Sequence, residues 1–208
     1  MEIPIDLYGY KLFEWMHHVS VKNEQENAEK SVLCHLCNRN VLLLESLDFS
    51  DDELSIIREQ DWINSGNKEI AARANDVMRR KERDKRATSL RASDLYVQLY
   101  DETDDYHCLL RSIQVRNIKS ICDAAYFDTI SEHSAKLPPY WITECVKALG
   151  KSYNERLGTL GGFLEDKYKN LYATHDYRHA RDIVEALLIV QTISQNEADY
   201  RRAILFGV

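Results

Sequence analysis

The stretch "NKEIAARANDVMRRKERDKRATSLRASDLYVQLY", residues 67–100, decides the fold. Its apolar residues recur every three or four positions in two successive segments, which is the spacing of amphipathic helices. The two stripes consist of Ile70, Ala71, Ala74, Val77 and Met78, and of Ala87, Leu90, Leu95 and Leu99. Neither glycine nor proline interrupts the stretch. We therefore expect a helical hairpin over about residues 68–102.

Helical spacing continues on both sides of this hairpin. The whole chain is 44% hydrophobic and contains only 3 prolines and 7 glycines, a balance that disfavours a protein of strands and turns. Further helices are expected at 5–19, 24–47, 50–62, 104–121, 124–136, 139–153, 155–173, 176–195 and 197–206. The sequence predicts an all-α fold of stacked antiparallel helical hairpins, either an α-solenoid or an irregular helical array.

Local signals mark where some of these helices begin. Ser50 and Glu53 have the spacing of a capping box, "NSGNKE" at 64–69 is typical of a turn, and Pro139 suits a first helical turn. We expect one all-helical region over 1–208, with sub-boundaries near 63–67 and 137–139. The apolar ending "RRAILFGV" either packs back on the region or leads into a longer protein.

Charge and cysteine content limit the class of protein. The formal net charge of −7 argues against a chain built to coat nucleic acid. The N-terminus lacks the basic region of a secretory signal, and the longest apolar run, at 182–193, is broken by Glu185 and too short to span a bilayer. Five scattered cysteines indicate reduced thiols. We expect a soluble cytoplasmic protein with no membrane contact.

Residues 67–100 also resemble a segment in the N-terminal helical region of a group of uncharacterised bacterial proteins. In that group an Arg-x-Ala-Asp-type segment ends one helix, and Arg-Asp followed by Ala-rich positions opens the next. The matching residues here are Arg73, Asn75-Asp76, Arg83-Asp84, Ala87, Ala92 and Tyr96. The resemblance implies a bacterial, helical-repeat-like region that precedes a further C-terminal domain, and it implies no activity.

Cys34 and Cys37 form a C-x-x-C pair within "SVLCHLCNRNVLLLESL", residues 31–47. On one continuous helix they would share a face with Val41 and Leu44, and free cysteine packs like a small apolar side chain. A zinc site would need two more ligands, and no second C-x-x-C stands at a usual distance. We expect core packing, with a metal or redox site as the alternative.

His175 and His179 are four residues apart, which would place both on one helix face as zinc ligands. The simpler interpretation makes Thr174 the N-cap of a helix, with Asp176 in its first turn. A third interpretation takes His175-Asp176 as the dyad of a metal-dependent hydrolase of the all-helical HD type. His133 or His107 and Asp199 would then complete the metal cluster.

Residues 73–91 carry eight Lys or Arg against three acidic residues. Arg79, Arg80, Arg83 and Arg86 are therefore candidates for contact with phosphates or with a partner. The alternative is a solvated end of the hairpin, where cations suit a helix C-terminus.

No set of nucleophile, base and oxyanion donors emerges, so we expect neither catalysis nor a cofactor. The predicted function is a non-catalytic protein-interaction or scaffolding region that binds a protein or peptide partner. The HD-type hydrolase and nucleic-acid binding through 73–91 are the alternatives.

Overall fold

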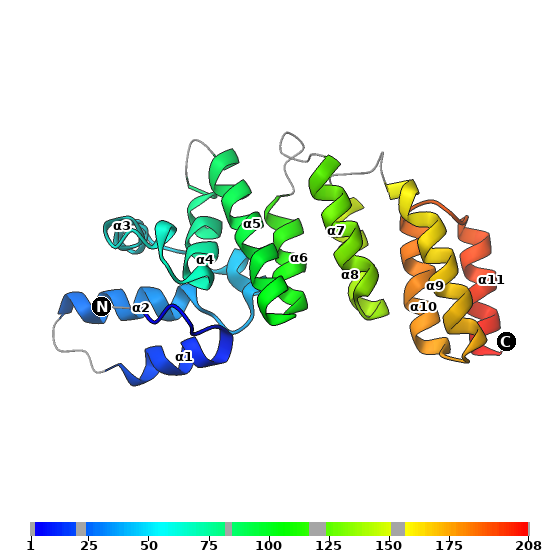
Figure 1. The fold of residues 1–208 in the computed structure, drawn as a ribbon, viewed down its shortest axis with the longest axis horizontal. Helices are drawn as coiled ribbons and strands as arrows, with labels where there is room; N and C mark the ends of the chain where they lie inside the picture. Colours follow the sequence, from blue (N-terminus) through cyan, green and yellow to red (C-terminus); the bar gives the residue numbers. More distant parts are fainter. Residues whose placement is uncertain (1–2, 20–23, 82–84, 117–123, 151–156, 208) are drawn as a thin grey trace. The chain divides into compact units, whose positions relative to one another are not determined.

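The computed structural model describes residues 3–19, 24–81, 85–116, 124–150 and 157–207. All regular structure in these ranges is helical, so the predicted all-α class is confirmed (Figure 1). The chain forms two compact units, Met1–Arg116 and Asn117–Val208. No helix within the described ranges has the length and apolar character needed to cross a membrane.

The first unit contains six α-helices and two short 3₁₀-helices among its described residues. They are α1 (Gly9–His18), α2 (Glu24–Leu36), η1 (Val41–Ser46), α3 (Asp51–Glu59), η2 (Trp62–Asn64), α4 (Lys68–Met78), α5 (Lys85–Thr103) and α6 (Tyr106–Val115). The second unit has α7 (Ala124–Lys136), α8 (Pro139–Gly150), η4 (Leu157–Leu160), α9 (Gly161–Ala173), α10 (Tyr177–Ile189) and α11 (Gln195–Phe206).

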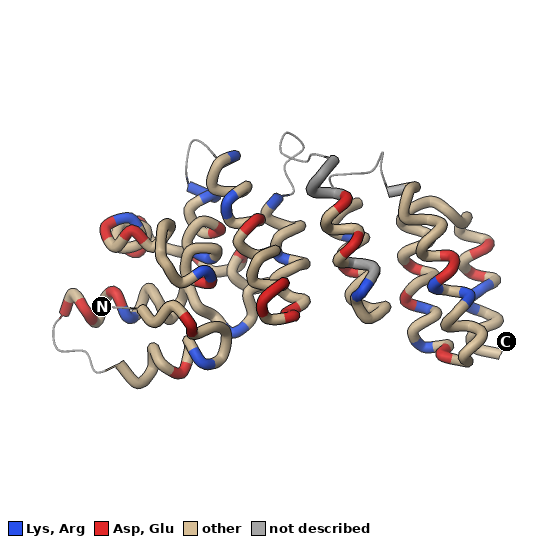
Figure 2. Tube along the Cα trace, viewed as in Figure 1, with Lys and Arg blue, Asp and Glu red and all other residues tan. Residues whose placement is uncertain are grey.

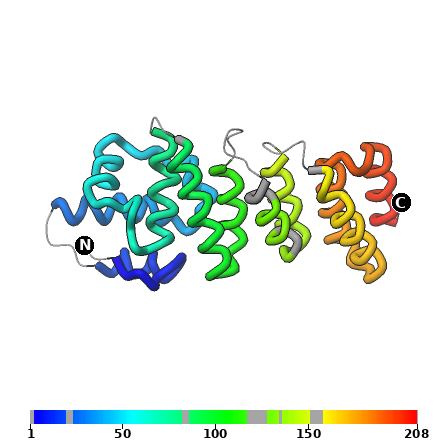
Figure 3. Tube along the Cα trace, turned by 45° about the horizontal axis from the view of Figure 1, so that its top comes forward, coloured from blue at the N-terminus to red at the C-terminus, as the bar shows by residue number. Residues whose placement is uncertain are grey.

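The hairpin predicted at 68–102 is confirmed as α4 and α5, and α6 packs on the other side of α5 (Figures 1 and 3). The other neighbours of α4 are α2, η1 and η2. This helix is therefore enclosed, and every residue from Glu69 to Met78 is buried. Its apolar stripe joins the core, but its polar side is buried as well.

Asp76 of α4 is paired with Arg111 of α6 through two hydrogen bonds. Arg111 donates from Nε to Oδ2 at 2.7 Å and from Nη2 to Oδ1 at 2.9 Å, and both side chains are fully buried. The hydroxyl of Tyr96 and Nε of Arg79 also donate to Asp76. Burial alone would lower the pKa of Arg111, but attraction to Asp76 outweighs it and raises that pKa above its usual value.

A second buried pair, between Arg73 and Glu69 of α4, lies against the end of α2. Arg73 donates from Nη2 to Glu69 and from Nη1 to the backbone carbonyls of Leu36 and Asn38. Those carbonyls lie where α2 stops. Their bonds to Arg73 replace those that a continuing helix would supply.

The continuous helix predicted over 24–47 is therefore wrong. The chain leaves helical geometry after Leu36, and two asparagine side chains hold the new path. Oδ1 of Asn38 accepts from the Asn40 amide, and Oδ1 of Asn40 caps η1 by accepting from Leu42. Asparagine competes with a helical backbone in this way because its short side chain reaches neighbouring amides.

The capping box predicted at residue 50 is confirmed, since Ser50 and Glu53 bond each other's backbone amides. Glu53 also accepts from the His35 ring at 2.8 Å, which ties α3 to α2. Burial would raise the pKa of Glu53, but these hydrogen bonds outweigh it and lower that pKa. The sub-boundaries expected near 63–67 and 137–139 fall inside the two units, at η2 and at the start of α8.

The second unit is built around α10, which packs against α8, α9 and α11. Thr143 of α8 donates to the Asp182 carbonyl at 2.7 Å. A side chain at Gly161, the first residue of α9, would collide with Thr192 in the turn before α11. The glycine permits this close approach of α9 to the turn before α11.

Replacing Asp76 by Asn should destabilise the first unit by about 3–5 kcal/mol, because Arg111 keeps its charge and loses its buried counterion. Urea unfolding followed by tryptophan fluorescence in a Trp141→Phe background measures this, since the remaining tryptophans, Trp15 and Trp62, belong to this unit. Glu102→Gln, which breaks the exposed pair with Lys68 between α4 and α5, is the matched control and should cost much less. Equal losses in the two variants would contradict this role for Asp76.

Candidate functional site

The turn between α9 and α10 reverses the chain within three residues. The amide of His175 donates to the Tyr172 carbonyl at 3.1 Å, and the amide of Asp176 donates to the Leu171 carbonyl at 2.9 Å. These are the two bonds of a Schellman motif, and His175 occupies its left-handed position with φ of 59°.

Asp176, not Thr174, is the N-cap of α10, which corrects the sequence prediction. Its side chain accepts from the His179 amide, and its Oδ2 lies 2.7 Å from Nδ1 of the His179 ring. Thr174 instead caps the end of α9 and donates its hydroxyl to the Asn170 carbonyl. The hydrogen bond from the His179 ring lowers the pKa of Asp176.

The tight turn brings three tyrosine rings into sequence along the surface. Tyr168 and Tyr172, one helical turn apart on α9, are stacked with ring centres 6.1 Å apart. Tyr172 and Tyr177 meet across the turn at 5.7 Å. The guanidinium of Arg201 lies 4.7 Å from the Tyr168 ring centre. We call Tyr168, Tyr172 and Tyr177 the aromatic strip.

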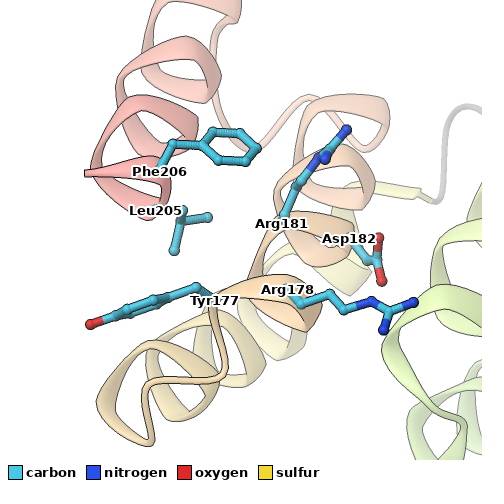
Figure 4. Close-up of a pocket in the computed structure, with 6 residues that line it drawn as sticks. All are labelled: Tyr177, Arg178, Arg181, Asp182, Leu205 and Phe206. Carbon is cyan, nitrogen blue, oxygen red and sulfur yellow. The ribbon is translucent and has the colours of Figure 1, made fainter. Parts of the chain in front are cut away.

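The strip leads into a pocket of about 460 Å³ between the start of α10 and the end of α11. Its lining residues are Tyr177, Arg178, Arg181, Asp182, Leu205 and Phe206. Figure 4 shows Tyr177 and Phe206 on the α10 and α11 sides, with Leu205 between them. Phe206 is 61% exposed and Tyr177 38%, whereas Leu205 is 8% exposed and forms an apolar floor.

Two arginines of α11 fix this helix to its neighbours. Arg201 donates to both carboxylate oxygens of Glu165 on α9, at 3.0 and 2.9 Å. Arg202 donates to Glu185 on α10 at 2.8 Å. Such two-point contacts hold the end of α11 in place, so the pocket is a stable feature of the second unit.

The two arginines that line the pocket differ from those of α11 in their ion pairing. Acidic and basic residues are interspersed on α9 to α11 (Figure 2), yet Arg178 and Arg181 form no ion pair with any described residue. Arg181 instead stacks on the Phe206 ring at 5.4 Å. Burial raises the pKa of Asp182 even though Arg181 and Arg178 act to lower it.

The two histidines proposed as metal ligands form hydrogen bonds within the turn between α9 and α10. Nδ1 of His175 lies 2.7 Å from the Tyr177 hydroxyl, and Nδ1 of His179 is bonded to Asp176. Two of the residues proposed to complete an HD-type cluster have other partners. Asp199 is paired with Arg202, and His107 is paired with Asp105 in the first unit. Over the described ranges, no group of three or more His, Cys, Asp or Glu side chains could hold a metal ion.

Cys37 lies in the core of the first unit, as predicted, and Cys34 is half-buried at its edge. Burial raises the pKa of Cys37 to about 12 and raises that of Cys34. His35 points to Glu53 on α3. Val41 and Leu44 are buried too, but they reach the core from η1 rather than from the same helix face.

The basic candidates at 73–91 are used in part within the first unit. Arg79 pairs with Asp76 and Glu45, and Arg80 donates to the carbonyls of Leu44, Glu45 and Leu47. Arg86 is exposed on α5. Arg83 lies outside the described residues.

Sequence reasoning missed the aromatic strip and the pocket. The available signal was the i, i+4 spacing of Tyr168 and Tyr172 followed by Tyr177, but a core stripe has the same spacing. Phe206 belongs to the apolar ending, for which the sequence leaves two possibilities, packing back on the region or leading into a longer protein. Whether these rings lie on the surface or in the core depends on how the ends of the helices meet in space, which the spacing of the residues does not reveal.

Comparisons with protein families, with curated proteins and with solved structures found no significant match. The function is therefore argued from the surface itself.

Zinc or manganese titrated into untagged protein should show no binding that depends on His175 and His179, because within the described ranges no third His, Cys, Asp or Glu side chain completes a metal site with them. Calorimetry of wild type and of a His175→Ala, His179→Ala variant measures this. One equivalent of tightly bound metal that disappears in the variant would contradict the structural role of these histidines and support the hydrolase alternative.

In the folded protein, Cys34 should react with iodoacetamide at pH 8 faster than Cys37. The Cys37 thiol is buried and its pKa of about 12 leaves almost no thiolate at that pH. Peptide mass spectrometry after timed labelling measures both rates, and labelling in urea should remove the difference. Comparable rates without denaturant would show that Cys37 is not part of a closed core.

Proposed function

We propose that the chain is a non-catalytic protein-interaction region, and that the aromatic strip with its adjoining pocket is the surface that binds a partner polypeptide. The observation that carries the proposal is the concentration of exposed apolar side chains on three consecutive helices. These are Tyr172, Tyr177 and Phe206, each more than a third exposed. Contiguous exposed apolar surface is typical of interaction sites.

The residue types support the same conclusion. Tyrosine, phenylalanine and arginine are enriched where partners bind, since they contribute large contact areas together with hydrogen bonds or charge. Here the rings are held by stacking with one another and with Arg201 and Arg181. A surface ordered before binding loses little conformational entropy when a partner docks.

The proposal also covers the origin, the location and the architecture of the protein. The resemblance of residues 67–100 and the reduced cysteines favour a bacterial cytoplasmic protein. In this proposal the antiparallel pairs are units of an α-solenoid that presents the surface to a partner.

Peptide-display selection on the immobilised full chain tests the proposal. Wild type should enrich a family of related sequences, and Tyr177→Ser with Phe206→Ser should weaken the binding of those peptides at least about tenfold, as loss of anchor residues does. Tyr140→Ser alters a tyrosine of α8 whose exposure lies between those of Tyr177 and Phe206; it is the matched control and should leave binding unchanged.

Circular dichroism and thermal unfolding of each variant establish that it is folded. A selection that enriches nothing above background on wild type would overturn the proposed function. Enriched peptides that bind the double variant as tightly as wild type would move the interaction to another surface.

A further inference from the structure

We propose that the pocket between α10 and α11 binds an acidic peptide segment in which a bulky apolar side chain stands next to carboxylates. This inference rests on the proposed function and specifies the partner. It combines the two parts of the pocket, which are an apolar recess and two cationic side chains at its edge.

The apolar part selects a side chain of substantial size. Leu205 forms the floor, and the Tyr177 and Phe206 rings stand on either side (Figure 4). A volume of about 460 Å³ lies within the range of about 300–1,000 Å³ in which proteins bind small organic groups. An aromatic or large aliphatic side chain fits such a recess and would be covered by both rings.

The cationic part selects negative charge beside that side chain. The chain as a whole has seven more acidic than basic residues, and acids already neutralise Arg201 and Arg202 nearby. Arg178 and Arg181 are nevertheless left without an ion-pair partner among the described residues. In a chain rich in acids, unpaired arginines at a pocket are complementary to a ligand carboxylate.

The acids at the pocket do not remove this preference. Asp176 is occupied by the His179 ring and by the α10 amide that it caps. Asp182 lines the pocket beside the two arginines (Figure 4), and Lys147 of α8 also acts on it. One carboxylate against two guanidinium groups leaves the pocket with a net positive charge. The first turn of α10 adds its own positive potential, because its leading amides point toward the pocket end of the helix.

Other occupants fit less well. A basic peptide would meet two arginines. A nucleic acid would gain two phosphate contacts here and be repelled by the net charge of the chain, whereas phosphate-driven binding normally uses more cations.

A peptide array tests the inference. It contains heptapeptides with Phe, Tyr, Trp, Leu or Met at the centre, each flanked by Asp and Glu, by Ser and Asn, or by Lys and Arg. Wild type should bind the acidic set at least about tenfold more tightly than the neutral set. The best acidic peptide, labelled with fluorescein, should lose affinity as sodium chloride is raised from 20 to about 300 mM.

Matched variants locate the effect. Arg178→Gln with Arg181→Gln should reduce affinity for that peptide about tenfold or more and remove most of its salt dependence. Arg58→Gln with Arg91→Gln makes the same change in net charge at exposed arginines of α3 and α5, and should change the affinity less than about twofold.

The outcomes separate this inference from the proposed function. Neutral or basic peptides that bind better than acidic ones, through Tyr177 and Phe206, would overturn the inference and leave the proposed function standing. No binding by any peptide would overturn both. Phe206-dependent self-association in sedimentation, or an oligonucleotide that binds more tightly through Arg178 and Arg181, would assign the pocket to another occupant and overturn the inference.

Discussion

The first unit depends on the burial of α4 on all sides. A helix enclosed in this way is normally apolar around its whole circumference, but α4 carries Glu69, Arg73, Asn75 and Asp76 inside. Buried polar groups are costly unless they are hydrogen-bonded, and buried charges are more costly still. Each of these four side chains therefore needs partners from the elements around it.

Those partners set the positions of the surrounding elements. Arg111 of α6 and Tyr96 of α5 bind Asp76, while Asn75 donates to the Ile63 carbonyl in η2. Arg73 binds the carbonyls at the end of α2, and the Gly9 amide at the start of α1 donates to Glu69. A helix with an apolar core face alone could slide or rotate against its neighbours, whereas these directional bonds permit one arrangement.

Local sequence signals predicted the bounds of a helix well where those bounds depend only on neighbouring residues. The bounds of α7 coincide with the predicted 124–136, and the capping box at Ser50 forms as its spacing indicates. Prediction failed where a distant side chain intervenes. The end of α2 depends on Arg73, more than thirty residues away in sequence, so the apolar spacing of 24–47 could not reveal it.

The candidate site shows the same limit for a different reason. Tyr168 and Tyr172 have the spacing of a core stripe, and only the Schellman turn at His175 places Tyr177 beside them on the surface. Three consecutive features, the left-handed residue, the Asp176 cap and the short connection, determine that arrangement. Each is visible in the sequence as an ordinary turn, and none by itself indicates which rings will meet.

The distribution of arginine partners explains why charge density in the sequence was a poor guide to binding. The dense basic stretch at 73–91 predicts contact with phosphates or a partner, yet Arg79 and Arg80 are bound by Asp76, Glu45 and backbone carbonyls. In α11, Arg201 and Arg202 find acids both on their own helix and on the facing ones. Arg178 and Arg181, in a less basic stretch, line an apolar recess together with Asp182, and neither forms an ion pair with a described residue. What makes a cation available to a partner is the absence of an internal counterion, and that depends on which helix faces it.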